Sequence, residues 1–402
     1  MKSLKVAILL GFTSVTRGNR SVIVLTIMIL TLVGLNLLFV PSLLAGLVSG
    51  SNDKLITTYS SDIVVTSRDA ANPLISGAGD MLTKIDAIPG VTASTPRNSL
   101  LSQMSFNGNR ATGTIYSIDP VLERQVFDIE GYLIEGSYLA PGDTGQILLG
   151  VQIAGADKTN LEFYSRSLQD VHAGDSINVT FGNNAQKTFT VKGIFYAEFI
   201  QTDLQAFITE ADFESVMPTA KDHAAYIHVK TEDNADLAVI SNKISRLGSD
   251  LKIFTWTDYA GIMRSMTDSF TAIRAILSTV NVLVAGFTVF ILTYIDVTSR
   301  RKQIGIQRAI GITSISITVA YLMRAIFLAL LGTILAAILF QYVVTPVEAQ
   351  YPFHFPFGAV YLKAGPPELT GMAVTLMGVS LIAAFLPVRG VTRMRIMDAI
   401  WG

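Results

Sequence analysis

The chain has 402 residues; half of them are hydrophobic, only 15% are charged, and the mean hydropathy is +0.47. An average soluble protein carries about 25% charged residues, so this composition excludes a disordered chain, a coiled-coil rod and a nucleic-acid-binding protein with a basic surface. The 30 basic and 31 acidic residues nearly cancel, and the sequence contains no cysteine. Disulfides, iron–sulfur clusters and thiolate nucleophiles are therefore excluded as well.

Four long runs contain no charged residue, namely Ser21–Ser51, Ala275–Ile295, Ala325–Val347 and Leu369–Val388. Each run reaches the ~20 residues that a helix needs to cross a ~30 Å hydrocarbon core. We therefore predict an α-helical membrane protein with four transmembrane helices surrounded by lipid. The predicted segments are residues 21–50 (including a stalk), 269–297, 324–347 and 369–388. The stretch before the first run is long for a signal peptide, so we expect an uncleaved anchor.

Lysine and arginine cluster beside these segments, and loops rich in both residues stay in the cytoplasm. The predicted cytoplasmic parts are an amphipathic N-terminal segment at 1–20, a basic loop at 298–323 and a tail at 389–402. The predicted outer parts are a large domain at 51–268 and a shorter loop at 348–368. This arrangement predicts a multi-pass protein of the cell membrane with both termini in the cytoplasm.

The outer stretch between the first two segments has a mixed α+β pattern. Both of its ends repeat a strand, a helix and a second strand, at residues 62–67, 80–88 and from Val91, and again at 224–230, 234–247 and 251–256. In the second unit, Asn234 is expected to cap the helix. Two β-α-β units predict one porter-like α/β subdomain, formed by residues 51–131 and 197–268.

Residues 132–196 interrupt this subdomain. They alternate apolar and polar residues and carry turn glycines, a pattern that predicts a β-rich insert. A further short helical element is expected at Asp203–Met217, after the insert.

No catalytic or metal-binding residue is predicted. His223 and His228 are five residues apart in a predicted strand region, so their side chains are expected on opposite faces; His172 and His354 are isolated in the sequence. Residues 150–159 resemble a phosphate-binding loop only weakly, and we interpret them as a strand-to-helix turn. Asn178 lies in a glycosylation sequon. Within the spans the polar content is low, and we place Asp296 and Arg324 at the cytoplasmic edge.

Small residues recur at helix-packing spacing in the third predicted segment, at Ala325 and Ala329 and at Gly332 and Ala336. Such spacing lets helices approach closely. It predicts either tight association, within one subunit or between two, or only the ordinary alanine and glycine content of a membrane helix.

The basic loop carries the most informative sequence, Arg300-Arg-Lys-Gln-Ile-Gly-Ile-Gln-Arg-Ala-Ile-Gly-Ile-Thr313. This stretch, here called the basic segment, either only fixes topology or forms a docking helix for a cytoplasmic partner. It resembles the R-x-[RK]-E-I-G-[IL]-x-[RK]-A-[IL]-G motif of the MacB/FtsX-type ABC transporter permeases. Residues 387–400 resemble the closing P-x-R-x-A-x-R-[LI]-x-P-x-E-A-[LI] motif of the same family. The chain departs from these motifs at Gln303, Ile396 and Asp398.

The resemblance implies a permease that dimerises, with an identical or paralogous copy, and pairs with a separate ATP-binding subunit. ATP and magnesium would be bound by that subunit, so no cofactor is expected on this chain. In this family the ATPase moves the outer domain through the first two membrane helices, a mechanotransmission mechanism that acts on a lipid, lipoprotein, peptide or drug. The implied ATPase-coupling residues are Lys302, Gln303, Ile304, Gly305, Ile306, Arg308, Ala309, Ile310 and Gly311.

One alternative function is a membrane-anchored binding or sensing protein that does no transport. A neighbouring gene with a G-x-x-x-x-G-K-[ST] motif would favour the permease, and a neighbouring kinase or regulator would favour the sensor. A membrane enzyme is not supported by any constellation of residues in the sequence. On the permease hypothesis, an aspartate at Ile306 or Ala309 is expected to uncouple the ATPase by burying a charge at the docking surface.

Overall fold

The computed structural model describes residues 20–69, 71–156, 161–355 and 358–394. It divides into two compact units. The helical unit comprises Met1–Val48, Met266–Phe353 and Val360–Gly402, and the α/β domain comprises Ser49–Ser265 with His354–Ala359. Nearly all of the predicted N-terminal segment 1–20, and residues 395–402 of the predicted tail, lie outside the described residues.

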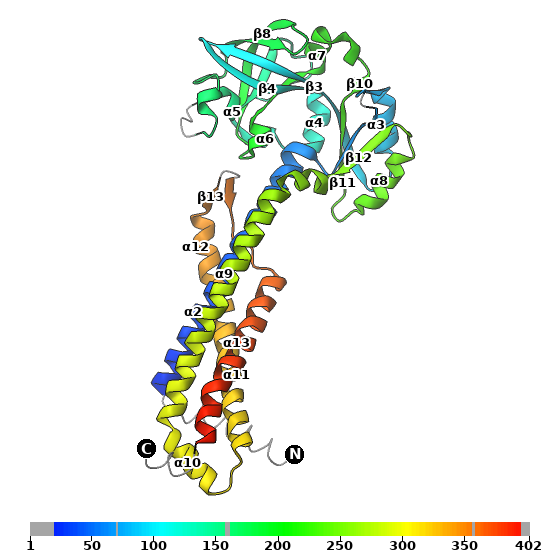
Figure 1. Cartoon of the computed structure of the whole chain (residues 1–402). Coiled ribbons are helices and arrows are strands. Elements are labelled where there is room, and N and C mark those ends of the chain that lie inside the picture. The colour runs from blue at the N-terminus through cyan, green and yellow to red at the C-terminus, as the bar shows by residue number, and fades with distance from the viewer. Residues whose placement is uncertain (1–19, 70, 157–160, 356–357, 395–402) are drawn as a thin grey trace. The chain divides into compact units, whose positions relative to one another are not determined.

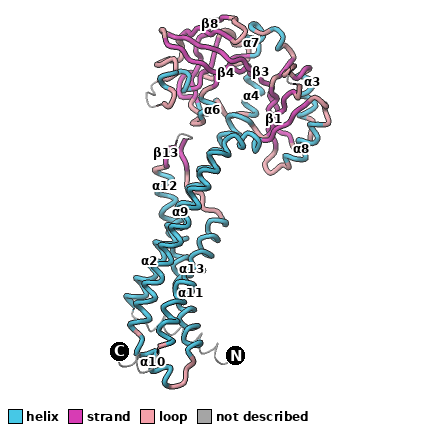
Figure 2. Tube along the Cα trace, viewed as in Figure 1, coloured by secondary structure: helices cyan, strands magenta, loops and turns pink. Residues whose placement is uncertain are grey.

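Helices dominate the helical unit, and strands are concentrated in the α/β domain (Figures 1 and 2). The long helices are α2 (Arg20–Lys54), α9 (Trp256–Ser299), α11 (Ser314–Leu339) and α13 (Pro366–Arg393). A π-helical turn, Phe340–Val344, joins α11 to α12 (Thr345–Gln350). Four apolar stretches are long enough to cross a membrane, at Ile23–Ser60, Ala275–Ser299, Ser314–Gln350 and Pro366–Arg393. The prediction of four membrane helices is confirmed.

Three further short elements lie between the long helices along the chain. Helix α10 (Arg301–Ala309) lies between α9 and α11, and strands β13 (Phe353–Phe355) and β14 (Gly358–Val360) form a small sheet of their own.

Small residues let α2 lie close to α11. A Cβ atom at Gly332 would lie 2.7 Å from the Cβ of Leu30, and one at Gly34 would lie 2.8 Å from the Cβ of Ala336. Both distances are too short for non-bonded carbon atoms. The small residues of the third membrane helix therefore serve close packing within one chain.

Helix α9 is different, because the rest of the chain covers little of it. Among its described side chains only Ala285, Val289 and Val297 are buried. Large apolar residues such as Ile276 and Phe287 are 65% and 66% exposed. This face of the chain must be covered by lipid or by another protein.

The α/β domain is built on a ten-stranded sheet. Its strands are β1 (Ile63–Ser67), β3 (Val91–Phe106), β4 (Asn109–Ile118), β5 (Leu133–Gly136), β6 (Gln146–Gly150), β7 (Ser176–Phe181), β8 (Gln186–Phe195), β9 (Gln205–Thr209), β11 (Tyr226–Thr231) and β12 (Leu251–Thr255). Strands β2 (Ile75–Ser76) and β10 (His223–Ala224) form a separate pair. Its helices include α3 (Ala78–Asp86), α4 (Pro120–Val126), α5 (Val151–Ala154), α6 (Ile200–Asp203), α7 (Glu210–Val216) and α8 (Leu237–Ser245).

The first lobe has the strand order β12-β1-β11-β3, with every neighbouring pair antiparallel. The units β1-α3-β3 and β11-α8-β12 therefore interleave, as in a split β-α-β fold. Apolar side chains of α3 and α8, such as Ile85 and Ile244, are fully buried in its core. One detail of the prediction was wrong: Asp236, not Asn234, caps α8, because Asp236 accepts the backbone N–H groups of Ala238 and Val239.

In the second lobe, β7 pairs with both β3 and β8 and so closes a ring of strands in the order β3-β4-β9-β6-β8-β7. The ring encloses a core that joins Met104 and Ile115 to apolar residues of the predicted insert. Strands β3, β4 and β9 thus complete a lobe to which residues 132–196 contribute β5 to β8.

The expected helix at Asp203–Met217 was wrong in its first half. Gln205–Thr209 is strand β9 and all five of its residues are buried; the helical residues of the stretch are Asp203, which ends α6, and Glu210–Val216. The strand is central, between β4 and β6, and its burial on both faces removes the alternation that marks a strand in sequence.

Helix α2 continues into the α/β domain and ends there in a π-helical turn, Leu55–Ser60. The Oγ1 atoms of Thr58 and Thr202 are hydrogen-bonded at 3.0 Å, and the Nζ of Lys54 lies 3.6 Å from a carboxylate oxygen of Glu198. The carbonyl of Ser60 is hydrogen-bonded to the ring of His228. These contacts fix the end of α2 in the α/β domain.

Candidate functional site: the basic segment and its attachment

The basic segment folds into helix α10, and its side chains divide between two faces. Ile304 and Gly305 are buried, and Arg308 is half-buried. Ile306 and Ile310, one turn apart, are 48% and 73% exposed. Together with the other exposed members of the predicted coupling set they form an outward face, which consists of Lys302, Gln303, Ile306, Ala309, Ile310 and Gly311.

The inward side of α10 is anchored by packing. Ile304 belongs to a buried cluster with Val297 of α9, Ile317 of α11 and Val388 and Val391 of α13. The guanidinium of Arg308 donates a hydrogen bond to the carbonyl of Met394. Helix α10 is therefore attached to three other helices of the unit, while no described residue covers its outward face.

The end of α10 is defined by a glycine. Gly311 has a φ of +96°, which glycine adopts without strain. The N–H of Ile312 donates to the carbonyl of Gln307 and that of Gly311 to Arg308, which is the Schellman arrangement. The side chain of Thr313 then accepts the N–H of Ser316 and caps α11. Two sharp caps set the path of the chain from α10 to α11.

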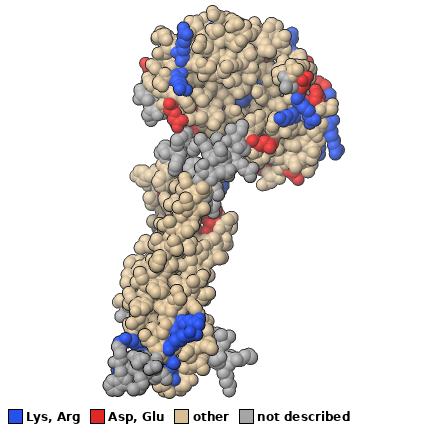
Figure 3. Space-filling view, in the orientation of Figure 1, with Lys and Arg blue, Asp and Glu red and all other residues tan. Residues whose placement is uncertain are grey.

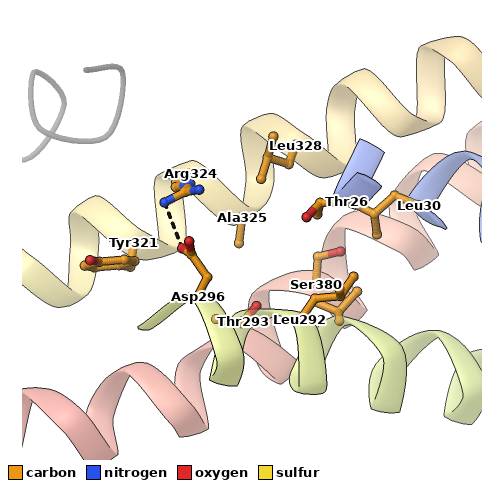
Figure 4. A pocket seen from close by; sticks show the side chains of 11 residues that line it. Thr26, Leu30, Leu292, Thr293, Asp296, Tyr321, Arg324, Ala325, Leu328 and Ser380 are labelled. Atoms are coloured by element: carbon orange, nitrogen blue, oxygen red, sulfur yellow. Dashed lines mark ion pairs between the residues drawn. The ribbon is translucent and has the colours of Figure 1, made fainter. Parts of the chain in front are cut away.

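One carboxylate links three helical elements at this end of the unit. Asp296, near the end of α9, lies 3.2 Å from the Nε of Arg300, which directly precedes α10. Its second oxygen lies 2.8 Å from Nη1 of Arg324 in α11 (Figure 4). The side chains of Asp296 and Arg324 are 15% and 5% exposed. Sequence patterning placed both residues at the same membrane edge, but their separation of 28 positions gave no sign of the pairing.

A small cavity of about 40 Å³ lies beside this ion pair, between α2, α9, α11 and α13. Figure 4 shows Asp296 and Arg324 at one side of it and Ser380 at another. The hydroxyl of Ser380 is buried and has no hydrogen-bond partner among the described residues. The helices are therefore not closely packed against one another here.

Basic side chains gather on the visible face at the α10 end of the helical unit, whereas most of that face is uncharged (Figure 3). Such a distribution is typical of a membrane protein with one basic edge.

The α/β domain holds a larger cavity, of about 200 Å³. Carboxylates of Asp119, Glu210, Glu214 and Asp222 line it, together with His223. Burial, with the nearby charges of Asp119 and Glu214, raises the pKa of Glu210 to about 7.

The remaining sequence candidates fall into separate places. His223 and His228 lie in different strands, β10 and β11, and His228 is buried. Gly150 and Val151 form the expected strand-to-helix turn between β6 and α5, while residues 157–160 of the phosphate-loop-like stretch lie outside the described residues. In the described part of the chain, no group of three or more His, Cys, Asp or Glu is placed to hold a metal ion. Asn178 is exposed in β7.

Two family profiles match the chain. Residues 23–247 match the MacB-like periplasmic core domain, and residues 275–396 match the FtsX-like permease C-terminal domain. Together with the four apolar helices and the large α/β domain, these matches define a multi-pass membrane protein of transporter type. The chain belongs to the MacB/FtsX-type family of ABC transporter permeases.

Individual relatives are distant. An uncharacterized ABC transporter permease of Methanocaldococcus jannaschii is 21% identical over 309 residues, which cover 75% of this chain and 73% of the relative. The macrolide export ATP-binding/permease protein MacB of Neisseria gonorrhoeae is 22% identical over 328 residues, which cover 77% of this chain and 47% of that protein. The chain thus spans about half the length of the MacB relatives it matches.

Among solved structures, the periplasmic region of MacB from Actinobacillus actinomycetemcomitans aligns at a TM-score of 0.36 with 16% identity, covering 50% of this chain and 92% of that one. The extracellular domain of the ABC-type transporter YknZ from Gram-positive bacteria aligns at a TM-score of 0.35 with 10% identity, covering 48% of this chain and 99% of that one.

Proposed function

We propose that the chain is the membrane subunit of an ABC transporter and that a separate ABC ATPase docks on the outward face of α10. The observation that carries this proposal is the exposure of Ile306 and Ile310, 48% and 73%, on a helix whose other side is anchored by Ile304. An apolar face beside Lys302 and Gln303 provides an apolar centre with a polar rim, as protein interfaces have.

Movement of the ATPase would reach the α/β domain through α2 and α9. Each of these helices continues without interruption from the helical unit into the α/β domain. The hydrogen bond of Thr58 and the ion pair of Lys54 attach the end of α2 to that domain. A continuous helix attached at one end can transmit a displacement, so we propose mechanotransmission rather than passage of substrate through the bilayer.

The substrate class that accompanies this mechanism is an extracytoplasmic lipid, lipoprotein, peptide or drug that is exported or extracted. The α/β domain would lie outside the cell membrane, and the basic segment would lie in the cytoplasm. The gathering of basic side chains at the α10 end supports that orientation.

A second permease copy, identical or paralogous, would complete the transporter. The poor coverage of α9 supports this, because Ile276 and Phe287 are about two-thirds exposed and available for helix packing. The arrangement would be a permease dimer with ATP and magnesium bound by the ATPase subunits.

The docking proposal is tested by purifying the chain together with the ABC ATPase encoded beside its gene. Changing Ile306→Asp places a charge in an apolar interface without a partner. We expect at least tenfold weaker association and loss of the permease's effect on ATP hydrolysis; tenfold is about 1.4 kcal/mol. The matched control Ile306→Val keeps the apolar face and should bind like the wild type.

If the wild-type chain never associates with the ATPase, and deletion of residues 302–311 leaves ATP hydrolysis unchanged, the permease function is contradicted. The membrane-anchored sensing protein would then be the better description.

A further inference from the structure

Asp296 of α9 contacts Arg300, which precedes α10, and Arg324 of α11. The backbone connection between α9 and α10 is a single residue. Helix α9 ends at Ser299 and α10 begins at Arg301, so Arg300 is the only residue between them. Arg300 has a non-helical backbone conformation, and its side chain does not cap α10. A single non-helical residue between two helices is a natural hinge.

The carboxylate of Asp296 contacts this hinge residue and a second arginine. One oxygen contacts Arg300, and the other contacts Arg324 of α11, at 3.2 and 2.8 Å. The contact with Arg300 is an i,i+4 pair that joins α9 to the N-cap residue of α10, and the contact with Arg324 reaches a separate helix. One side chain therefore limits both bending at Arg300 and separation of α9 from α11.

The net stability that the Asp296–Arg324 ion pair contributes is too small to explain why the pair is there. A pair as buried as Asp296 and Arg324 has a large desolvation cost and contributes little net stability, whereas two opposite charges held at 2.8 Å favour one geometry. The cavity beside the pair shows that α2, α9, α11 and α13 do not pack tightly at this level. The ion pair therefore adds to the buried cluster of Val297, Ile304 and Ile317 in fixing the relative position of α9 and α11.

We propose that Asp296 is a positioning residue that makes α9, α10 and α11 move as one body when a partner displaces α10. This inference rests on the proposed function, in which the ATPase acts on α10. With the carboxylate present, displacement of α10 is passed to α9. Without it, α10 swings at Arg300 while α9 stays in place.

The absence of cysteine in the sequence permits a direct measurement. Spin labels on Leu277→Cys of α9 and Val374→Cys of α13 occupy positions that are 40% and 72% exposed, outside the ion pair and not among the residues named for packing against a second copy. The distance between them is measured in the purified complex with the ATPase, without nucleotide and with a non-hydrolysable ATP analogue. The wild type is expected to show a nucleotide-dependent shift in distance.

Two variants remove the link in different ways. The double change Asp296→Asn with Arg324→Gln removes both charges and leaves no unpaired buried charge, and Arg300→Gln removes only the contact across the hinge. Each is expected to lose at least half of the shift while binding the ATPase within about twofold of wild type.

Asp296→Glu keeps a carboxylate and should show the wild-type shift. The control Arg393→Gln changes an exposed arginine of α13 and should have no effect.

A full shift in the double variant or in Arg300→Gln would overturn the role of Asp296. A loss of the distance shift in Asp296→Glu as large as that in the double variant would also overturn it. Asp296→Glu keeps the carboxylate, and the proposed role depends on that group. If the wild type binds no ATPase or shows no shift, the proposed function itself fails, and that outcome is distinct from the others.

Discussion

Arg97 and Glu123 form a fully buried ion pair in the α/β domain, each with a side chain 1% exposed. The guanidinium also lies 3.9 Å from the ring centre of Phe127. Removing one partner of such a pair leaves the other charge buried alone. Glu123→Gln should therefore lower the free energy of unfolding by about 3–5 kcal/mol.

Thermal unfolding of the purified chain, followed by tryptophan fluorescence, measures this loss. The paired change Arg97→Met with Glu123→Leu removes both charges and should cost clearly less than Glu123→Gln alone. An equal or larger loss in the pair would show that the ion pair itself stabilises the fold.

The burial of Asp203 makes the stability of the α/β domain depend on pH. Its carboxylate accepts the N–H groups of Ala197 and Phe199, but burial outweighs these bonds and raises its pKa to about 7 from an ordinary value of 3.8. A raised pKa means that the folded chain binds the proton more tightly than the unfolded chain. The contribution of Asp203 to the stability of the folded chain is thus complete below pH 3.8 and is lost as the pH rises through about 7.

Burial lowers the pKa of His228 to about 3, so His228 opposes Asp203 over this range. We therefore expect Asp203→Asn to make the slope of melting temperature against pH more positive between about pH 4 and pH 7. Glu210, whose pKa is also raised to about 7, acts in the same direction as Asp203, so some dependence should remain in the variant. The exposed control Asp233→Asn should keep the wild-type slope. An unchanged slope in Asp203→Asn would show that another group titrates.

At the level of single residues, the sequence located the basic segment but not the roles within it. Ile304 and Ile306 look equivalent in the motif, yet one is buried and the other half-exposed, because they lie on different sides of α10. The link between Asp296 and Arg324 depends on how α9 and α11 lie side by side, which no local pattern encodes.

Among the elements, α2 and α11 depend on glycine for their contact. Gly332→Leu would introduce a Cβ only 2.7 Å from the Cβ of Leu30, which is below any normal contact between two carbon atoms. We expect a loss of several degrees in melting temperature in detergent, from an overpacking cost of about 1–3 kcal/mol. The matched control is Gly378→Leu in α13, where a Cβ meets nothing within 4 Å; equal losses in both would contradict this packing.

Sequence patterning predicted β1, α3, β11, α8 and β12 of the first lobe well, and the buried residues of α3 and α8 lie on one face of each helix. It failed for β9, because a strand buried on both faces has no alternation. It also did not predict that β3, with 16 residues, serves two lobes at once. Long-range pairing of this kind is decided by the whole sheet rather than by local propensity.

For the whole molecule, composition and charge-free runs were sufficient to predict the membrane class, and two short motifs were sufficient to predict the family. The high hydrophobic content of the sequence comes from the four long helices, while the α/β domain has its own exposed surface and apolar core. The partner, the substrate and the movement are properties of an assembly, and a single sequence records them only through exposed faces such as that of α10.

The central claim, that the outward face of α10 binds the ATPase, is tested most directly by site-specific cross-linking. Ile310→Cys, at the C-cap of α10, and Ile382→Cys in α13 have nearly equal exposure, 73% and 72%, in a chain that has no other cysteine. With a thiol-reactive photo-crosslinker, Ile310→Cys should join the chain to the co-purified ABC ATPase and Ile382→Cys should not. Cross-linking from Ile382→Cys alone, or none from Ile310→Cys in an intact complex, would contradict the account.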